Sequence, residues 1–235
     1  NNMPLDKSRP TRYNNTALYI TQCYYTRMVL MPAVRKVSKE QIIDAAVEVL
    51  RDDGFSAINA RSVAKKLGCS TQPIYFSFKN MDELKAALTQ RAIELHTQRV
   101  RDSLRAHEGS DSRYSSYGMG FVKFAAEEKQ LFRWLYLEDN QPGRHQEDVL
   151  EPEIIRTVMD EFGYDEVTAR AFHRDMTYYS YGLAILANTG HLALTETELR
   201  EAFRREFRAL AAYYGPPKKL PEFAERENAV HQLFR

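Results

Sequence analysis

A very tight connection between two short helical patterns constrains this chain more than any other feature. Apolar residues recur at helical spacing up to Leu67, and Gly68-Cys69 follows at once, so the first of the two helices should end there. Ser70 then offers a side-chain oxygen that can cap the next helix. Two short helices joined by a three- to four-residue turn that contains glycine form a helix-turn-helix, whose second helix presents its first residues to base edges in the DNA major groove.

The segment before this turn carries the start and stop signals of another helix. Ser38, with Gln41 three residues later, fits a reciprocal capping box. Gly54 suits a left-handed residue that ends a helix, and Asn59 can cap the next one. Phe55 is expected to fill the space between these helices. The sequence therefore predicts a module of three short helices.

The residues that open the second helix of the motif are suited to reading bases. Thr71, Gln72 and Pro73 stand in its first turn, where a proline costs little because the N–H groups there lack intrahelical partners. Glutamine can pair with adenine through two hydrogen bonds, and threonine and proline can contact a thymine methyl group. Tyr75 and Lys79 are placed for phosphates. The predicted DNA-binding residues are Arg35, Lys36, Asn59, Arg61, Ser70, Thr71, Gln72, Pro73, Tyr75, Ser77 and Lys79.

Charge alone does not identify a nucleic-acid partner. The chain has 33 Lys and Arg against 32 Asp and Glu, which gives a formal net charge of +1. Residues 35–80 carry eight Lys or Arg and five Asp or Glu, a modest basic excess. DNA binding would therefore depend on the placement of a few groups and not on a strongly basic surface.

Turn, capping and aromatic positions around Ser70 agree together with a known pattern. The pattern consists of Gly68, Ser70, Ile74, Tyr75, Phe78, Asn80, Glu83 and Leu84. Through it, roughly residues 36–88 resemble the DNA-binding domain of the tetracycline-repressor (TetR) family of transcriptional regulators. Members of that family commonly have a phosphate-binding lysine where this chain has Met81, and a histidine where it has Ser77. Met81 cannot make the ionic contact, so we expect anchoring by Tyr75, Lys79 and helix N-termini.

The rest of the chain shows no strand pattern that competes with helix. Periodicity predicts helices near 81–107, 113–126, 129–137, 153–162 and 165–188, then a last helix that is capped by Thr195 or Thr197 and reaches Tyr214. We expect an all-α fold, with a helix-turn-helix domain at 35–80 and a helical regulatory and dimerisation domain at 81–215. Residues 1–34 are either an added, weakly structured start or an arm that packs on the body or reaches DNA, and 216–235 form a tail.

The last two predicted helices have faces suited to helix packing. Apolar residues of the final helix recur at helical spacing, and small residues of the preceding helix permit close approach. The TetR resemblance implies a four-helix bundle with a second subunit, although the same residues could instead fill the core of one chain. A two-fold dimer also matches a palindromic operator. The predicted interface residues are Gly182, Leu183, Leu186, Ala187, Leu199, Phe203, Phe207, Leu210 and Tyr214.

Aromatic residues concentrate in the middle helices. An apolar cavity with a few polar groups between helices is a usual small-molecule site, but an aromatic stripe at helical spacing can equally be core. The run 178–181 favours a cavity most, because its three tyrosine hydroxyls cannot all face solvent. The predicted lining residues are Phe121, Phe124, Trp134, Met159, His173, Met176, Tyr178, Tyr179 and Tyr181.

Several other classes of protein are not supported by the sequence. Two cysteines, Cys23 and Cys69, do not make a disulfide framework and fit a reducing cytoplasm. No apolar run approaches the roughly 18–20 residues of a membrane span. No metal-ligand spacing, phosphate loop or nucleophile motif indicates a metal, a cofactor or a catalyst.

Together these features predict a cytoplasmic, homodimeric, ligand-responsive regulator. It is interpreted as a repressor that binds a double-stranded DNA operator and a small-molecule effector, with no cofactor, no metal, no enzymatic activity and no membrane contact. The alternative is a helical small-molecule-binding protein, or an enzyme, that carries a vestigial DNA-binding module.

Overall fold

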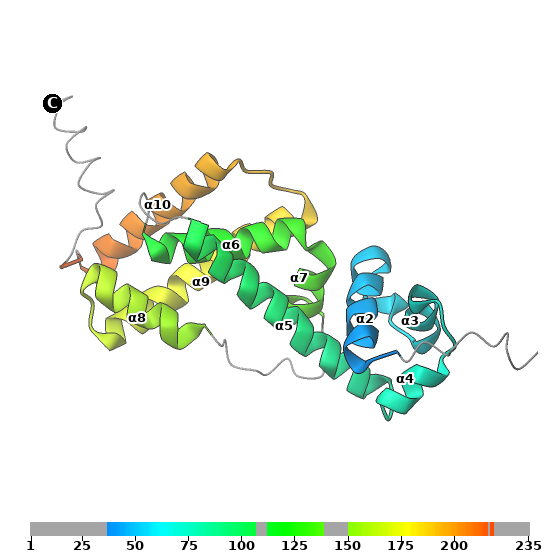
Figure 1. Cartoon of the computed structure of the whole chain (residues 1–235). Coiled ribbons are helices and arrows are strands. Elements are labelled where there is room, and N and C mark those ends of the chain that lie inside the picture. Colours follow the sequence, from blue (N-terminus) through cyan, green and yellow to red (C-terminus); the bar gives the residue numbers. More distant parts are fainter. Residues whose placement is uncertain (1–36, 107–111, 139–149, 216, 219–235) are drawn as a thin grey trace, which may run out of the picture. The chain divides into compact units, whose positions relative to one another are not determined.

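The computed structural model describes residues 37–106, 112–138, 150–215, 217 and 218. All regular elements in these ranges are helices, as predicted (Figure 1). They are α2 (Lys39–Asp53), the one-turn 3₁₀ helix η1 (Phe55–Ala57), α3 (Ala60–Leu67), α4 (Gln72–Ser77), α5 (Met81–Ala106), α6 (Arg113–Glu127), α7 (Lys129–Tyr136), α8 (Glu151–Phe162), α9 (Glu166–Thr189) and α10 (Glu196–Tyr214). The described residues from Ser38 onward belong to one compact unit. The expected N-terminal extension and most of the expected tail lie outside the described residues.

Side-chain caps fix where several helices begin. The predicted capping box at α2 is present, since the Ser38 hydroxyl accepts from the Gln41 N–H and the Gln41 side chain accepts from the Ser38 N–H. Asn59 caps α3 by accepting from two backbone N–H groups. Thr195, one of the two residues predicted for this role, forms a second capping box at α10. These local signals explain why the helix boundaries follow the sequence so closely.

Three details near the helix-turn-helix differ from the simplest expectation. Gly68 ends α3 in the left-handed region with φ 67°, as predicted, whereas Gly54 has φ 80° and ψ 178°, which is positive but not left-handed helical. Ser70 is not the cap of α4: Thr71 precedes the helix, and no side chain caps it. Phe55 was expected in the core but is 44% exposed, because the η1 turn directs it outward.

The small N-terminal helices close on their own apolar core. Ile42, Leu50, Val63 and Ile74 are each no more than 1% exposed. Helix α2 packs against α3 and α4, and also against α5 and α7 of the larger helical part. In that larger part, α6 lies between α5 and α9, while α8 and α10 pack against both α6 and α9 (Figure 1). This arrangement places α4 at one end of the unit. It also encloses a space among the helices from α5 to α10.

Candidate DNA-binding face and ligand cavity

Helix α4 has one buried face and one exposed face. Ile74 and Phe78 are 1% and 2% exposed and hold the helix against the motif, as their spacing predicts. Gln72 is exposed and Tyr75 is 59% exposed, so both point away from that core. The exposed face thus offers an amide and a phenol, groups that can hydrogen-bond to bases and phosphates.

Phe76 also lies on this face, although it is not among the predicted DNA-binding residues. It is 81% exposed, the most exposed of the large apolar side chains in the described part of the chain. A phenylalanine on a recognition helix can make an apolar contact with a thymine methyl group. The signal was available in the sequence, because position 76 falls off the inward spacing of Ile74 and Phe78.

The start of α5 lies directly after α4 and is organised by its own side chains. The Asn80 side chain accepts from the Glu83 N–H at 2.9 Å and so caps the start of α5. The Glu83 carboxylate accepts from the Lys79 N–H at 2.8 Å and lies 3.5 Å from Lys39 Nζ. The hydrogen bond from the Lys79 backbone, aided by Lys39, holds the pKa of Glu83 below its usual value. The turn between α4 and α5 is therefore a fixed structure that positions Lys79.

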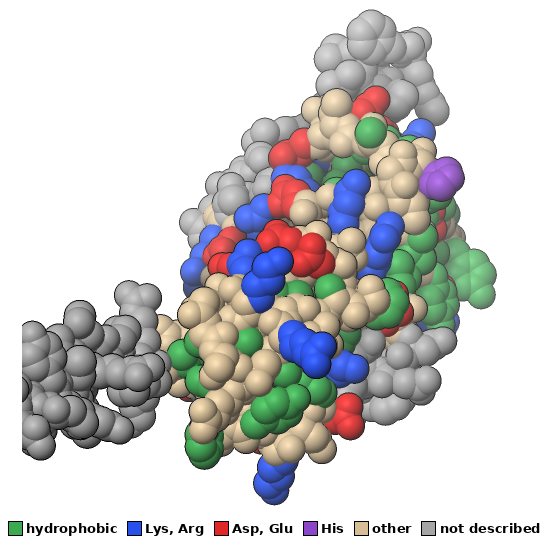
Figure 2. Space-filling view, turned by 90° about the vertical axis from the view of Figure 1, so that its right-hand side faces the viewer, with side chains coloured by type: hydrophobic (Ala, Val, Ile, Leu, Met, Phe, Trp, Pro, Cys, Tyr) green, Lys and Arg blue, Asp and Glu red, His purple; other side chains and the backbone are tan. Residues whose placement is uncertain are grey.

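The other predicted DNA contacts divide into exposed and engaged residues. Ser70, Arg61 and Lys79 are exposed, whereas Thr71, Pro73 and Ser77 are partly buried. The Asn59 side chain is exposed but occupied by its cap of α3. Arg35 and Lys36 lie outside the described residues. Figure 2, which views the end of the molecule where α3 and α4 lie, shows basic side chains spread among acidic and hydrophobic ones.

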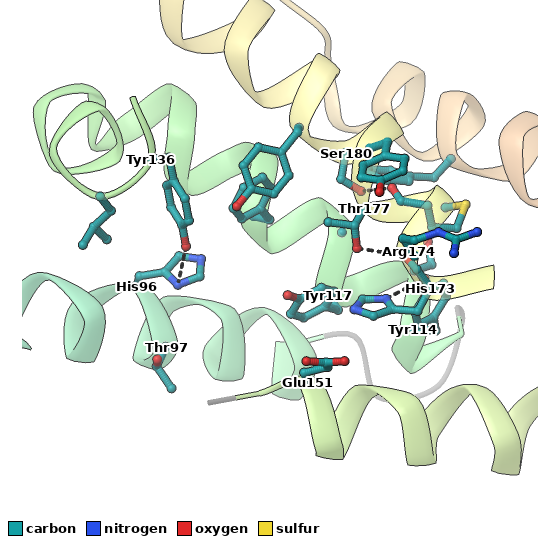
Figure 3. Close-up of a pocket in the computed structure, with 18 of the residues that line it drawn as sticks. His96, Thr97, Tyr114, Tyr117, Tyr136, Glu151, His173, Arg174, Thr177 and Ser180 are labelled. Atoms are coloured by element: carbon teal, nitrogen blue, oxygen red, sulfur yellow. Dashed lines mark hydrogen bonds between the residues drawn. The ribbon is translucent and has the colours of Figure 1, made fainter. Parts of the chain in front are cut away.

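A cavity of about 550 Å³ lies among helices α5 to α10 (Figure 3). Most of the predicted lining residues border it: Phe121, Trp134, His173, Met176, Tyr178 and Tyr181. Tyr178 lies at its rim and is 67% exposed. Phe124, Met159 and Tyr179 do not line it: Phe124 is buried at 1% exposure, and the Tyr179 hydroxyl donates to the Ala202 carbonyl at 3.4 Å.

Two tyrosine–histidine pairs are among the polar groups that line the cavity. The Tyr114 hydroxyl lies 3.0 Å from His173 Nδ1, and the Tyr136 hydroxyl lies 3.3 Å from His96 Nδ1. Burial raises the pKa of the Tyr114 hydroxyl above its usual value. The predicted lining residues include only His173 of these four, because the pairs join different helices and leave no local spacing.

The residues predicted for the dimer interface differ in how deeply they are buried within their own chain. Leu199, Phe203 and Phe207 are 4%, 3% and 9% exposed in their own chain, where Phe203 and Phe207 also border the cavity. Leu183 is buried as well, at 9% exposure, while Leu186 is 43% exposed. The remaining residues of the set are exposed or partly buried: Gly182, Ala187, Leu210 and Tyr214. Most of the stripe on α10 thus packs inside the chain, and α9 carries the more accessible apolar residues.

The described residues contain no group of three or more His, Cys, Asp or Glu side chains that could hold a metal ion. Within the same ranges, no helix is long and apolar enough to cross a membrane.

Comparison with known proteins identifies the N-terminal helices. Residues 42–88 match the sequence profile of bacterial regulatory proteins of the tetR family. The chain carries a TetR-family domain. The nicotine-responsive transcriptional repressor HdnoR of Paenarthrobacter nicotinovorans is 37% identical over 73 residues, which cover 31% of this chain and 36% of that protein. The transcriptional activator FasR of Mycolicibacterium smegmatis is 28% identical over 105 residues, 45% of this chain and 48% of that protein. The chain therefore matches less than half the length of these relatives.

Solved structures extend the likeness beyond the TetR-family domain. A transcriptional regulator from Pseudomonas aeruginosa superposes with a TM-score of 0.57 at 15% identity, over 76% of this chain and 95% of that one. A TetR-like regulator from a Rhodococcus species gives 0.53 at 21% identity, over 77% of this chain and 98% of that one. At such identities the likeness establishes the fold and not a shared ligand.

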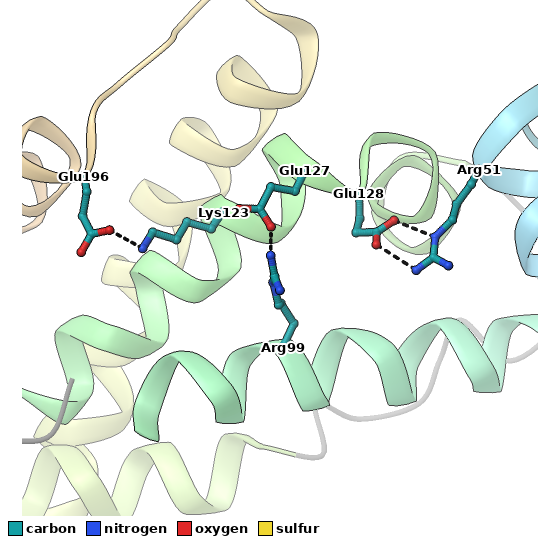
Figure 4. A network of polar contacts seen from close by, with 6 residues as sticks. All are labelled: Arg51, Arg99, Lys123, Glu127, Glu128 and Glu196. Carbon is teal, nitrogen blue, oxygen red and sulfur yellow. Dashed lines mark hydrogen bonds and ion pairs between the residues drawn. The ribbon is translucent and has the colours of Figure 1, made fainter. Parts of the chain in front are cut away.

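Ion pairs connect the last part of α6, and Glu128 just after it, with α2, α5 and α10 (Figure 4). Lys123 lies 2.7 Å from Glu196 of α10, Arg99 of α5 pairs with Glu127, and Arg51 of α2 donates to both carboxylate oxygens of Glu128 at 2.9 and 2.8 Å. The two-point geometry of Arg51 and Glu128 fixes orientation as well as distance.

Asn188 joins the end of α9 to the same region. It is 1% exposed, and its amide donates to the carbonyls of Ala125 and Lys129 at 2.9 and 3.0 Å. Its side-chain oxygen accepts from Arg133 at 3.0 Å. The turn between α6 and α7, which includes Glu128, is thereby held by α9 on one side and by α2 on the other.

Proposed function

We propose that this protein is a ligand-responsive, DNA-binding transcriptional regulator that acts as a repressor and binds a palindromic operator as a dimer. The observation that carries the proposal is the exposed face of α4, held by the TetR-family domain, which presents Gln72, Tyr75 and Phe76 together. Base edges are read by a few such groups on a short helix, so a modest basic excess is sufficient.

The connection between the cavity and α2 supports a response to ligand. Helix α9 lines the cavity with His173 and Tyr181 and carries Asn188 in its last turn, where the Asn188 amide is bonded to the α6–α7 turn. Glu128 in that turn binds Arg51 of the TetR-family domain. A ligand that shifts α9 against α6 would therefore move or strain this turn, and with it the orientation of α2 and α4.

The known relatives are consistent with this role. HdnoR is described as a nicotine-responsive repressor and FasR as a transcriptional activator. We assign repression to this chain because the stretch that is 37% identical belongs to a repressor. Cytoplasmic location and the absence of enzymatic activity follow from the same assignment.

Selection of duplexes from a random DNA pool tests the proposal. The purified protein should enrich one short sequence arranged as an inverted repeat, and a variant with Gln72→Ala and Tyr75→Ala should enrich none. Both substitutions lie on the exposed face, so the variant should remain folded, which its helical circular dichroism checks. If the unaltered protein enriches no sequence, the alternative of a small-molecule-binding protein or enzyme with a vestigial DNA module replaces the regulator.

A further inference from the structure

The chemistry of the cavity defines a class of effector, and this inference rests on the proposed function. We infer that the cavity binds an elongated, uncharged aromatic molecule with a hydrogen-bonding group near each end. The inference stands on three features: aromatic walls, two tyrosine–histidine pairs at a fixed separation, and charged side chains confined to one end (Figure 3).

The walls of the cavity are rich in rings, and nearly half of its lining residues carry one. The ring of Phe121 lies 5.0 Å from that of Tyr181 and 5.3 Å from that of Tyr136. Tyr136 and Tyr181 in turn meet edge to face at 5.6 Å. Rings at such angles present both faces and edges, and an aromatic ligand can stack on the former and meet the latter edge-on. A flexible aliphatic chain would gain apolar burial here, but it could neither stack on these rings nor meet their edges as a ring does.

The separation of the two pairs follows from the packing of α6 against α9. Tyr114 on α6 meets His173 on α9, and Phe121 on α6 meets Tyr181 on α9. The two helices therefore run in the same direction, and the second contact lies seven to eight residues beyond the first. At 1.5 Å per residue this amounts to about 10–12 Å along the helices.

The second tyrosine–histidine pair lies at the far contact. The rings of His96 and Tyr136 lie 5.8 and 5.3 Å from the ring of Phe121. Figure 3 shows this pair at one side of the cavity and the pair of Tyr114 and His173 at the other. A tyrosine hydroxyl and an imidazole can each take part in more than one hydrogen bond, as donor or acceptor. Each end of the cavity can thus bind one polar group of a ligand.

Among the described residues, charged side chains border the cavity only at the end formed by α8, the first half of α9, and α10. Arg170 lies 3.3 Å from Glu151, and Arg174 lies 3.1 Å from Asp175, so these charges have partners within the chain. The fourth charged lining residue, Arg204, lies 4.0 Å from Glu201. Between this end and His96, the described lining holds no Lys, Arg, Asp or Glu. A charged group buried in this stretch would lose its hydration without gaining a counter-charge, and the arginines at the other end already pair with acids of the chain, so we infer an uncharged ligand.

Trp134 offers a direct measurement of binding. It is the one tryptophan of the sequence, lines the cavity at 1% exposure, and donates its indole N–H to Thr89 at 3.1 Å. We would titrate the full chain, without DNA, with 4,4′-dihydroxystilbene, unsubstituted trans-stilbene, hexadecanoate and the cationic dye crystal violet. The dihydroxy compound should quench Trp134 saturably and bind roughly tenfold more tightly than stilbene, the gain expected from hydrogen bonds at the two ends. Tighter binding of hexadecanoate or crystal violet, or no saturable binding of the dihydroxy compound, overturns the inference.

Matched variants test the two ends separately. Tyr114→Phe and Tyr136→Phe each remove one hydroxyl and keep the ring, so each should weaken dihydroxystilbene several-fold and leave stilbene unchanged. Tyr179→Phe is the control, because Tyr179 lies on α9 but does not line the cavity. If both compounds lose affinity equally, the hydroxyls act only on the shape of the cavity and the inference fails. Because DNA is absent, this failure is distinct from a failure to select an operator.

Discussion

Gly118 packs directly against Phe203 at the border of the cavity. A Cβ atom at position 118 would lie 2.8 Å from two carbons of the Phe203 ring, which is only 3% exposed. Gly118→Ala should lower the free energy of unfolding, because overpacking costs about 1–3 kcal/mol and the gain in helix propensity is at most about 1 kcal/mol. Urea denaturation measures the change.

A second substitution tests whether contact with the Phe203 ring causes the loss of stability. Phe203→Leu shortens the ring that the new methyl group would meet, so Gly118→Ala should cost less in that background. Strictly additive effects of the two substitutions would show that the contact is not the source of the strain.

Glu83 gives the helix-turn-helix a defined response to pH. Its folded-state pKa is lowered by the Lys79 N–H and Lys39, so its contribution to stability is present above the usual value of 4.5 and is lost as the pH falls through the lowered value. Thermal unfolding across acidic pH should therefore show a smaller loss of stability in Glu83→Gln than in the unaltered chain. Parallel curves for the two proteins would contradict the assigned hydrogen bond.

At the residue scale, sequence reasoning recovered the cavity only in part. It found Phe121, Trp134 and Tyr181 because they are aromatic, but the same criterion also selected Phe124 and Tyr179, which face elsewhere. It missed Tyr114 and His96 because their partners lie 59 and 40 residues away in the sequence. Which way a helix turns its rings depends on packing between helices, and local spacing does not contain that information.

At the scale of helices, prediction from sequence was far more successful. Ser38, Asn59 and Thr195 mark helix starts through hydrogen bonds to residues two or three positions away, so the signal is local and complete in the sequence. The apolar stripe of α10 was also predicted, but the sequence did not decide whether it faces its own chain or a second subunit. Leu199, Phe203 and Phe207 face their own chain, because α10 packs on α6 and α9.

The link between Arg51 and Glu128 predicts how α2 and the α6–α7 turn communicate. Arg51→Met should leave binding of DNA and of ligand nearly unchanged, since an exposed ion pair contributes only about 0.2–1 kcal/mol to stability. The factor by which a ligand changes DNA affinity should shrink, because the two-point contact that transmits the shift is lost. Fluorescence anisotropy of labelled operator, with and without ligand, measures that factor.

The control for this variant lies on α5. Arg105→Met removes a basic residue that lies 3.9 Å from Asp102 on the same helix. It should preserve the full ligand effect. An unchanged ligand effect in Arg51→Met would instead show that coupling runs through another contact of α2, such as the bond from Arg91 to Asp44.

At the scale of the whole molecule, the exposed apolar residues near the end of α9 are the surface that we propose for a second copy. Leu186 and Ile185 are 43% and 38% exposed near Gly182, where an added Cβ atom would meet no neighbouring side chain within 4 Å. Leu186→Glu should convert a dimer of twice 27.3 kDa to the monomer in sedimentation equilibrium.

Val167→Glu is the matched control on the same helix. Val167 is 80% exposed and lies in the first turn of α9, away from these residues. It should leave the dimer intact. A monomeric unaltered chain at micromolar concentration would remove the dimer from the account, and equal effects of the two variants would place the interface elsewhere.

Sequence-specific DNA binding is the central claim, and one ratio tests it most directly. The dissociation constants of the protein for its selected duplex and for a scrambled duplex of the same composition should be compared at one salt concentration. The account predicts a preference of roughly a thousandfold or more, reduced by Gln72→Ala through loss of about 1–3 kcal/mol of base discrimination. Equal affinity for the two duplexes would contradict it.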